Sequence, residues 1–568
     1  MIDFSSIKLN EYQTKLTEKV VSKLTDRYQE ALYEVLTTVP YIQNLISPDR
    51  RYVKDMPKDE LGRIIPDYEN PHILTNTDFF TESARHFQKH GCYTLLSPNS
   101  NPTSEYSKFW KEELRRCREG LVRSDGEWIT GYMYMYLNYC PMMVNIVSSN
   151  SNAANRVDGF PLFWEGIYLR YHIINQARNT GKHFIEFARR GCSKSYSLGS
   201  VAGHNLIVGE NQIATKKVKT FVVAETDEYL SVSSDGTMNK FSTMLHFIRQ
   251  NTEFANLLVT DNPSQGKWMM GYKDEYGRIK GSQNLVSTIA LKGDPDKVRG
   301  KRGTILFEEM GNFNNLLATY NTGRYSVEEG NMVFGQMLLV GTSNEKESNF
   351  SSAKQLRYNP DSYNLFSIPN VYDKPKQGRH RFGYFYPGYL NRAGCYNKDG
   401  VSDVTKALVE IFIKRQEADL SNNQSTILST IAENPITPAE AINKIKTTWF
   451  PVVQLQERIT QLDNDNTLYD NVYIGTLVQT SDNKVSFIPT NDMPIRSFKQ
   501  STNMMEGALE IYEMPEKRSD GTNYIDRYCV GYDPVDNDVA NSSSFASAIV
   551  LDLFNARIVA EWTGRSQM

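Results

Sequence analysis

The feature that most constrains this fold is an alternation of short apolar runs with helical stretches, which begins near Lys182. In order, the segments read HFIEFA, SYSLGSVAGHNLIV, KTFVVAET, FSTMLHFIRQ, GTILFEE and QMLLVGTS. Short strands that alternate with helices predict βαβ units, in which helices cover both faces of a parallel sheet. Ligands of such sheets bind at the carboxyl ends of the strands, so the loops after the strands are expected to carry the chemistry.

Composition sets few limits on the partners of the chain. Its 568 residues are 23% charged and 40% hydrophobic, which is typical of a globular protein with about two to four domains. The formal net charge of −3 disfavours nucleic-acid binding through overall charge, although a local basic lining stays possible. The six cysteines are scattered, and no run approaches the roughly 18 apolar residues that span a bilayer, so a soluble protein of a reducing cytosol without a membrane partner is expected.

The segments that flank this alternating region have patterns of their own. Near the N-terminus, apolar residues recur every four positions, which predicts an amphipathic helix that ends at Pro40. This helix packs on its own domain or docks on a partner. The repeat consists of Leu16, Val20, Leu24, Tyr28, Leu32 and Leu36. The aromatic run from Gly126 to Met143 is interpreted as core. Tyr473 to Pro489 reads as a β-hairpin, EMPEKRSDGTNYID as a linker, and YCVGYDPV with FASAIVLDL as a strand pair.

The stretch ARRGCSKSYS, residues 188–197, follows the first apolar strand and precedes a helix. The phosphate-loop pattern G-x-x-x-x-G-K-[ST] fits at Lys194 and Ser195, but Ala188 and Ser193 replace its glycines. The context of a strand before and a helix after still places a helix N-terminus toward an anion, and Gly191 can supply one unusual backbone angle. We therefore predict a phosphate-binding loop, with an ordinary turn and a solvated lysine as the alternative.

A second signal is GTILFEE, an apolar run that ends in Glu308 and Glu309. Two adjacent carboxylates at the carboxyl end of a strand suit hydrolysis, because one can hold Mg²⁺ and the other can polarise the attacking water. Solvated acids after a strand are the alternative. Together with the loop, the pair predicts an ATPase.

Weaker signals lie around the same sheet. The strand QMLLVGTS ends near Thr342, whose hydroxyl could sense the γ-phosphate. Arg189 and Arg190 lie inside the loop, where a guanidinium could stabilise charge on the phosphoryl oxygens. The basic runs KVRGKRG (297–303) and KKVK (216–219) could contact a nucleic-acid backbone or could be solvated.

Taken in order, these motifs resemble the large terminase subunit of tailed bacteriophages, a DNA-packaging motor and nuclease. The resemblance covers the chain from about residue 80 to its end. It rests on WITGYMYMYLNYCPM, the loop with arginines before its lysine, GKRGTILFEEMGNF, the strand that ends in GTS, PITPAEA and GYDPV. The loops of this family often lack the standard glycines.

The resemblance implies a role for each matching residue. Lys194 and Ser195 correspond to the phosphate and Mg²⁺ ligands, Glu308 to the metal acid, Glu309 to the catalytic carboxylate and Thr342 to the coupling element. Arg190 corresponds to a loop arginine that acts as a finger in cis. The nucleotide contacts expected within the loop are Arg189, Gly191, Cys192, Ser193, Lys194 and Ser195.

The family's second domain is an RNase H-like nuclease that uses Mg²⁺ or Mn²⁺. Asp533 resembles the first of its metal-binding acids, whereas Asp536, Asp538 and Asp552 match no later position of the family. A two-metal site needs carboxylates from several elements. The sequence therefore predicts an incomplete nuclease domain and doubtful cleavage by this chain.

The complete prediction is a P-loop NTPase of RecA/ASCE-like α/β fold that binds ATP and Mg²⁺. The expected parts are an N-terminal helical arm (1–60), an ATPase core (61–430), a lid with a hairpin (431–515) and the start of an RNase H-like domain (524–568). The resemblance implies viral double-stranded DNA, a portal protein, a small terminase subunit and a homo-oligomeric ring as partners. It also implies that the protein is located in the host cytoplasm, attaches transiently to the procapsid and is not a component of the mature virion. The alternatives are a helicase-type or remodelling ATPase and a nucleotide-binding scaffold without turnover.

Overall fold

The computed structural model divides into two compact units, Met1–Glu457 and Arg458–Met568, which are described separately. It describes residues 22–70, 72–147, 154–209, 217–255, 257–330, 332–341, 347–372, 381–421, 424–441, 472–482, 484–495, 507–534 and 545–564.

The centre of the first unit is an eight-stranded, mainly parallel sheet. Its order is β18-β5-β15-β12-β6-β11-β8-β7, and the six strands from β18 to β11 are parallel neighbours, with β8 and β7 added antiparallel. The strands in this order are β18 (Tyr384–Tyr386), β5 (Phe184–Ala188), β15 (Met337–Gly341), β12 (Thr304–Phe307), β6 (Lys219–Ala224), β11 (Leu285–Ala290), β8 (Lys267–Met270) and β7 (Leu258–Asn262). This mixed α/β architecture with a parallel sheet is the one expected from the alternating pattern.

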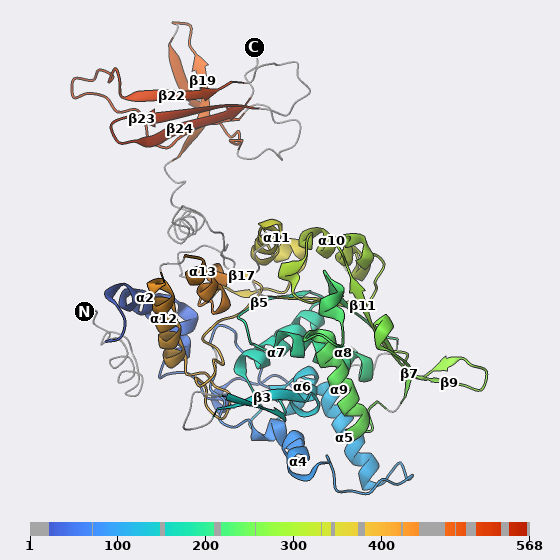
Figure 1. Cartoon of the computed structure of the whole chain (residues 1–568). Coiled ribbons are helices and arrows are strands. Elements are labelled where there is room, and N and C mark those ends of the chain that lie inside the picture. The colour runs from blue at the N-terminus through green and yellow to red at the C-terminus, as the bar shows by residue number, and fades with distance from the viewer. Residues whose placement is uncertain are drawn as a thin grey trace. The chain divides into compact units, whose positions relative to one another are not determined.

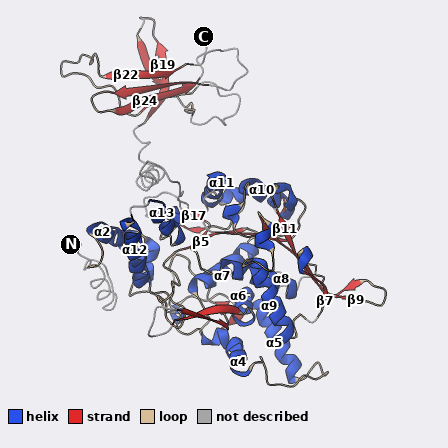
Figure 2. Cartoon of the chain, in the orientation of Figure 1, coloured by secondary structure: helices blue, strands red, loops and turns tan. Residues whose placement is uncertain are grey.

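Helices cover both faces of this sheet (Figures 1 and 2). On one face lie α7 (Glu165–Asn179), α8 (Lys194–Ile207) and α9 (Thr237–Asn251), and on the other lie α10 (Leu316–Val327) and α11 (Glu347–Tyr358). The strands β5, β12 and β15 are buried at every position, as strands covered on both sides must be.

A further helical layer packs beside α8 and α9. It consists of α4 (Glu82–His90), α5 (Glu105–Glu119) and α6 (Gly131–Tyr139). All nine residues of α6 are buried, which confirms that the aromatic run belongs to the core. Its tyrosines keep their hydroxyls bonded: those of Tyr134 and Tyr139 both donate to the buried carboxylate of Glu113.

The C-terminal part of the predicted N-terminal helix is present as α2 (Asp26–Thr38). Leu16 and Val20 lie outside the described residues, and Leu24, which was predicted to be helical, lies before the start of α2. The helix ends next to Pro40, which opens the short helix α3 (Pro40–Ile46). Both helices contact α12 (Val404–Leu420), where the Gln416 side chain accepts from the Thr25 amide (2.7 Å) and donates to the Lys23 carbonyl (3.0 Å). This confirms that the helix packs on its own domain.

The remaining elements of the first unit are short. After α12 come α13 (Gln424–Glu433) and α14 (Pro438–Ala441). Five two-stranded pairs complete the unit: β1 (Leu121–Val122) with β2 (Trp128–Ile129), β3 (Met142–Val147) with β4 (Ala154–Gly159), β9 (Tyr272–Lys273) with β10 (Ile279–Lys280), β13 (Glu328–Glu329) with β14 (Met332–Val333), and β16 (Ile368–Pro369) with β17 (Arg381–Phe382). Among the described residues, no helix is long and apolar enough to cross a bilayer.

The second unit is a six-stranded antiparallel sheet. Its order is β20-β19-β21-β24-β23-β22. The strands are β19 (Tyr473–Gln479), β20 (Val485–Pro489), β21 (Leu509–Ile511), β22 (Tyr528–Asp533), β23 (Ala546–Asp552) and β24 (Arg557–Gly564). The predicted hairpin is confirmed as β19 and β20, and the predicted strand pair as β22 and β23.

This sheet joins two regions that the sequence had placed in separate parts. Strand β21 pairs with β19 on one side and with β24 on the other, so the hairpin and the C-terminal strands share one sheet. The expected linker EMPEKRSDGTNYID runs within this unit, between β21 and β22, whereas the division between the units falls at Glu457 and Arg458. A three-residue strand at β21 is too short to give a hydrophobic pattern of its own, which explains the difference.

The central strand β12 predicts a large difference between two isoleucines of the first unit. Ile305 is fully buried in β12, whereas Ile65 is 51% exposed. We expect Ile305→Ala to lower the free energy of unfolding by about 2–5 kcal/mol, because it leaves a cavity in a core covered on both sides, and Ile65→Ala to lower it by less than about 0.5 kcal/mol. Chemical unfolding followed by tryptophan fluorescence measures both. Equal effects of the two substitutions would contradict the position of β12.

Candidate active site

The loop ARRGCSKSYS connects the end of β5 at Ala188 to the start of α8 at Lys194. Two of its residues have left-handed backbone angles, Gly191 (φ 73°) and Ser193 (φ 58°, ψ 36°). Such a conformation costs a serine about 1–3 kcal/mol, and it is held here by bonds from Ser197, whose amide (3.0 Å) and hydroxyl (2.9 Å) both donate to the Ser193 carbonyl. The chain thus turns sharply without the second glycine of the phosphate-loop pattern.

A buried ion pair lies beneath this loop. The Arg170 guanidinium, from α7, bonds the Glu186 carboxylate of β5 through two parallel contacts of 2.8 Å. Its third nitrogen donates to the Cys192 carbonyl (3.1 Å) and to the Ser197 hydroxyl (2.7 Å). One arginine therefore ties together a helix, the strand before the loop, the loop itself and the helix after it.

The loop lysine and the first loop arginine are both largely buried. The Lys194 ammonium lies 3.4 Å from the Arg189 carbonyl, at the N-terminal end of α8, where the helix dipole favours an anion. The Arg189 guanidinium donates to three carbonyls, those of Leu390 (3.2 Å), Arg190 (2.9 Å) and Asn391 (2.8 Å). In this structure Arg189 holds the loop through these bonds, and its contact with a nucleotide stays a prediction.

The acid pair follows β12 at the same edge of the sheet. The Ser195 hydroxyl donates to Oε1 of Glu308 (2.9 Å), so the loop serine and the first acid meet, although β15 lies between their strands. The Thr237 hydroxyl, from the first residue of α9, donates to the other oxygen, Oε2 (2.5 Å). Glu308 is 3% exposed, and this burial raises the pKa of Glu308 to about 7, against the lowering effect of the two hydroxyl bonds.

The second acid, Glu309, has a left-handed backbone (φ 46°) and is half-buried. Glu309 precedes a short 3-10 turn, Met310–Asn312, so the backbone leaves the direction of β12 at this residue. The phenol of Tyr229 lies close by: burial raises the pKa of Tyr229, and the charge of Glu309 raises it further. Glu308 and Glu309 thus occupy different environments, one enclosed and one accessible, as two different tasks require.

The other predicted residues are placed as follows. Arg190 is exposed and forms an ion pair with Glu433 of α13 (3.1 Å), and its amide donates to the Glu433 carbonyl (3.2 Å). The Cys192 side chain is buried, and its thiol donates to the Arg189 carbonyl. Thr342 lies outside the described residues.

Of the acid predicted for the nuclease site, Asp533, and the three carboxylates near it in sequence, only Asp533 and Asp552 lie within the described residues. Asp533 is exposed at the end of β22, and Asp536 and Asp538 fall outside the described residues. Asp552 is buried against Arg527, whose hydrogen bonds lower the pKa of that carboxyl. Among the described residues, no three or more His, Cys, Asp or Glu side chains are grouped as a metal site requires.

Three groups of this site escaped the sequence analysis: Arg170, Glu186 and Thr237. An acid inside the apolar run FIEFA was an available signal, because a carboxylate in a strand covered on both faces needs a cation. Thr237 gave no such signal. It reaches Glu308 because α9 packs closely on α8 at Gly199, where a Cβ would lie 3.0 Å from the Phe241 amide nitrogen and the Thr237 carbonyl oxygen.

Comparison with known proteins gives only distant neighbours. No protein-family profile matches the chain, and no curated sequence matches it. Among solved structures, a mutant of the large terminase ATPase domain of Thermus phage P74-26 aligns with a TM-score of 0.29 at 10% identity, over 47% of this chain and 92% of that one. The large terminase of bacteriophage HK97 aligns with the same TM-score and identity, over 71% of this chain and 64% of that one. A likeness this distant establishes neither a family nor an activity.

The raised pKa of Glu308 predicts a pH dependence of stability in the absence of ligands. Because the folded pKa of about 7 lies above the usual 4.5, the contribution of this carboxyl is fully present below about pH 4.5 and is lost as the pH rises through 7. Between pH 5 and 8, we expect the free energy of unfolding of the wild type to fall by up to roughly 3 kcal/mol relative to that of Glu308→Gln. Chemical unfolding at several pH values measures this difference, with Glu417→Gln, at an exposed position, as the control. Parallel curves of unfolding free energy against pH for the wild type and Glu308→Gln would contradict the prediction.

The buried ion pair predicts a strong asymmetry between single and double substitution. Arg170→Met leaves the Glu186 carboxylate buried without its partner, and we expect a loss of about 3–5 kcal/mol in the free energy of unfolding. The double variant Arg170→Met, Glu186→Leu removes both charges and should recover most of that loss. Unfolding of the single and double variants gives the coupling energy. Additive effects of the two substitutions would show that the pair does not hold this loop.

Proposed function

We propose that this chain binds ATP with Mg²⁺ at the loop 189–195 and hydrolyses it as the motor subunit of a large terminase, which moves viral double-stranded DNA into a procapsid. The observation that carries the ATPase proposal is the contact between Ser195 and Glu308. A hydroxyl from the helix after the loop and a carboxylate from the end of another strand meet at one edge of a parallel sheet. The motor and its viral DNA are inferred from the order of the sequence motifs.

The donor set fits a hard divalent cation. The Ser195 hydroxyl and the Glu308 carboxylate are oxygen ligands of the kind that Mg²⁺ prefers together with phosphate oxygens, and Thr237 bonds the same carboxylate. When bound, Mg²⁺ would neutralise charge on the phosphate oxygens. Glu308 must be ionised to serve as a ligand, and the Thr237 bond to its carboxylate favours the ionised form.

The phosphates would lie against the N-terminus of α8. The first amides of that helix and the Lys194 ammonium present positive charge there, and Arg170 holds the loop in place from below. The half-buried Glu309 follows Glu308 at the carboxyl end of β12, and in this proposal its carboxylate orients a water and accepts its proton. The exposed Arg190 could reach the γ-phosphoryl group only by leaving Glu433, so its role as a finger is part of the proposal.

The partners that follow from this proposal are duplex DNA, a portal protein, a small terminase subunit and further copies of this chain. The proposal places them in the host cytoplasm. It does not include nuclease activity, because the described residues form no group of three or more metal-binding side chains around Asp533.

Hydrolysis by defined variants tests the ATPase proposal. We expect Lys194→Ala to lower kcat/KM for ATP at least about 100-fold, because phosphate binding and charge neutralisation are both lost. Glu309→Gln should lower kcat about 100- to 1,000-fold and leave nucleotide binding intact, because it removes only the proton acceptor. Glu417→Gln on α12 is the matched control for charge.

The same assay separates the alternatives. Hydrolysis stimulated by duplex DNA without strand separation agrees with a packaging motor, whereas unwinding would favour a helicase. A wild-type protein that binds ATP and does not turn it over would be a nucleotide-binding scaffold and would overturn the proposal.

A further inference from the structure

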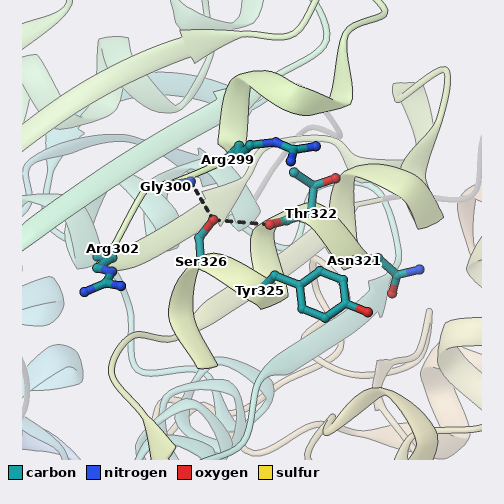
Figure 3. Close-up of a pocket in the computed structure, with 7 residues that line it drawn as sticks. All are labelled: Arg299, Gly300, Arg302, Asn321, Thr322, Tyr325 and Ser326. Carbon is teal, nitrogen blue, oxygen red and sulfur yellow. Dashed lines mark hydrogen bonds between the residues drawn. The ribbon is translucent and has the colours of Figure 1, made fainter. Parts of the chain in front are cut away.

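A hollow lies on the first unit, beside the second half of α10 (Figure 3). It has a volume of about 380 Å³ and opens between α10 and the loop that precedes β12. The residues that line it include Arg299, Arg302, Asn321, Thr322, Tyr325 and Ser326. It is at the small end of the range for ligand sites in proteins, about 300–1,000 Å³.

The basic loop of this hollow is anchored to α10. The Ser326 hydroxyl accepts from the Gly300 amide (2.8 Å), and it lies 3.2 Å from each of two carbonyls, those of Val298 and Thr322 (Figure 3). Before the loop, the Lys297 ammonium donates to the carbonyls of Ala290 (2.9 Å) and Leu291 (2.7 Å). Because the loop is bonded at Gly300 through its amide and at Lys297 through its ammonium, the backbone that carries its arginines has a fixed position.

The side chains around the hollow are suited to an anion with an attached apolar group. Its lining has two guanidinium groups, an amide and hydroxyls, and it includes no carboxylate. Arg299 is paired with Asp296 at the surface (2.5 Å), and within the described part of the chain the Arg302 guanidinium has no bonded partner. The ring of Tyr325 is 86% exposed and lines the same hollow, and Arg299 and Arg302 lie on different sides of Ser326 (Figure 3). Guanidinium groups next to an exposed aromatic ring are typical of contacts with nucleic-acid backbones and the sugars or bases attached to them.

The hollow and the predicted nucleotide site are connected through one strand and one helix. Strand β12 begins directly after Arg302 and Gly303 and ends directly before Glu308. Helix α10 follows the acids and carries Asn321, Tyr325 and Ser326. A ligand in the hollow would therefore touch the elements that position the acids.

We propose that this hollow binds a phosphate of a nucleic-acid backbone through Arg299 and Arg302, with Tyr325 packed against the neighbouring sugar or base. The choice of duplex DNA as the ligand rests on the proposed function, whereas the binding itself needs no ATP hydrolysis. Asp296 can release Arg299 at small cost, because both side chains are exposed and a solvent-exposed ion pair contributes little.

Binding of a labelled random-sequence duplex, measured by fluorescence anisotropy without nucleotide, tests this proposal. At about 0.1 M salt we expect Arg302→Ala and Arg299→Ala each to weaken binding about 10-fold and to reduce the salt dependence of log K by about one unit, as the loss of one phosphate contact does. Tyr325→Ala should weaken binding with an unchanged salt dependence. Arg85→Ala is the matched control, because Arg85 is likewise exposed and paired with an aspartate, Asp78.

The possible outcomes separate this proposal from the one on ATP. Unchanged duplex binding in both arginine variants, or no duplex binding by the wild type, would overturn it. Competition by millimolar inorganic phosphate or AMP, with no effect of the arginines on duplex affinity, would assign the hollow to a small free phosphate and would also overturn it. Lys194→Ala should bind the duplex as the wild type does, so a chain that lacks ATP turnover can still confirm the backbone site.

Discussion

The buried pair of Arg170 and Glu186 is the interaction on which the candidate site depends. Two charges removed from water cost several kcal/mol each, and here they are compensated by parallel hydrogen bonds and by the further bonds of Arg170 to Cys192 and Ser197. As a result, the strand, the loop and the next helix are all bonded by the guanidinium of Arg170, which fixes their relative positions. A loop that lacks both glycines of the phosphate-loop pattern can then keep a single conformation, because Arg170 bonds it from beneath.

The acid Glu308 is held in an equally specific way, between hydroxyls of two helices. Ser195 is the second residue of α8, directly after the loop lysine, and Thr237 is the first residue of α9, so the carboxylate is fixed only if both helices keep their positions. Burial raises its pKa to about 7, which leaves it close to the point of ionisation at neutral pH. If Glu308 holds Mg²⁺ as proposed, it must be ionised, so the binding of the cation and the loss of this proton would be linked.

The sequence predicted what depends on local pattern and missed what depends on packing. The strand before the loop, the helix after it, the acids after β12 and the hairpin of β19 and β20 were all predicted, because each is encoded within about ten residues. The contact of Thr237 with Glu308 joins residues 71 positions apart and depends on the close approach of α8 and α9 at Gly199. Likewise, the single sheet of the second unit depends on β21, whose three residues are too few to form a periodic signal.

The ion pair between Arg190 and Glu433 shows how the loop is connected to the end of the first unit. Arg190 is exposed and its bond to Glu433 is a surface pair, so the pair contributes at most about 1 kcal/mol. A phosphate group near the loop carries more negative charge than one carboxylate, and guanidinium bonds to phosphate in a bidentate way. Phosphate can therefore compete with Glu433 for Arg190, and any such exchange would release the last residue of α13. The amide bond from Arg190 to the Glu433 carbonyl would remain, so the loop and the helix would loosen without separating.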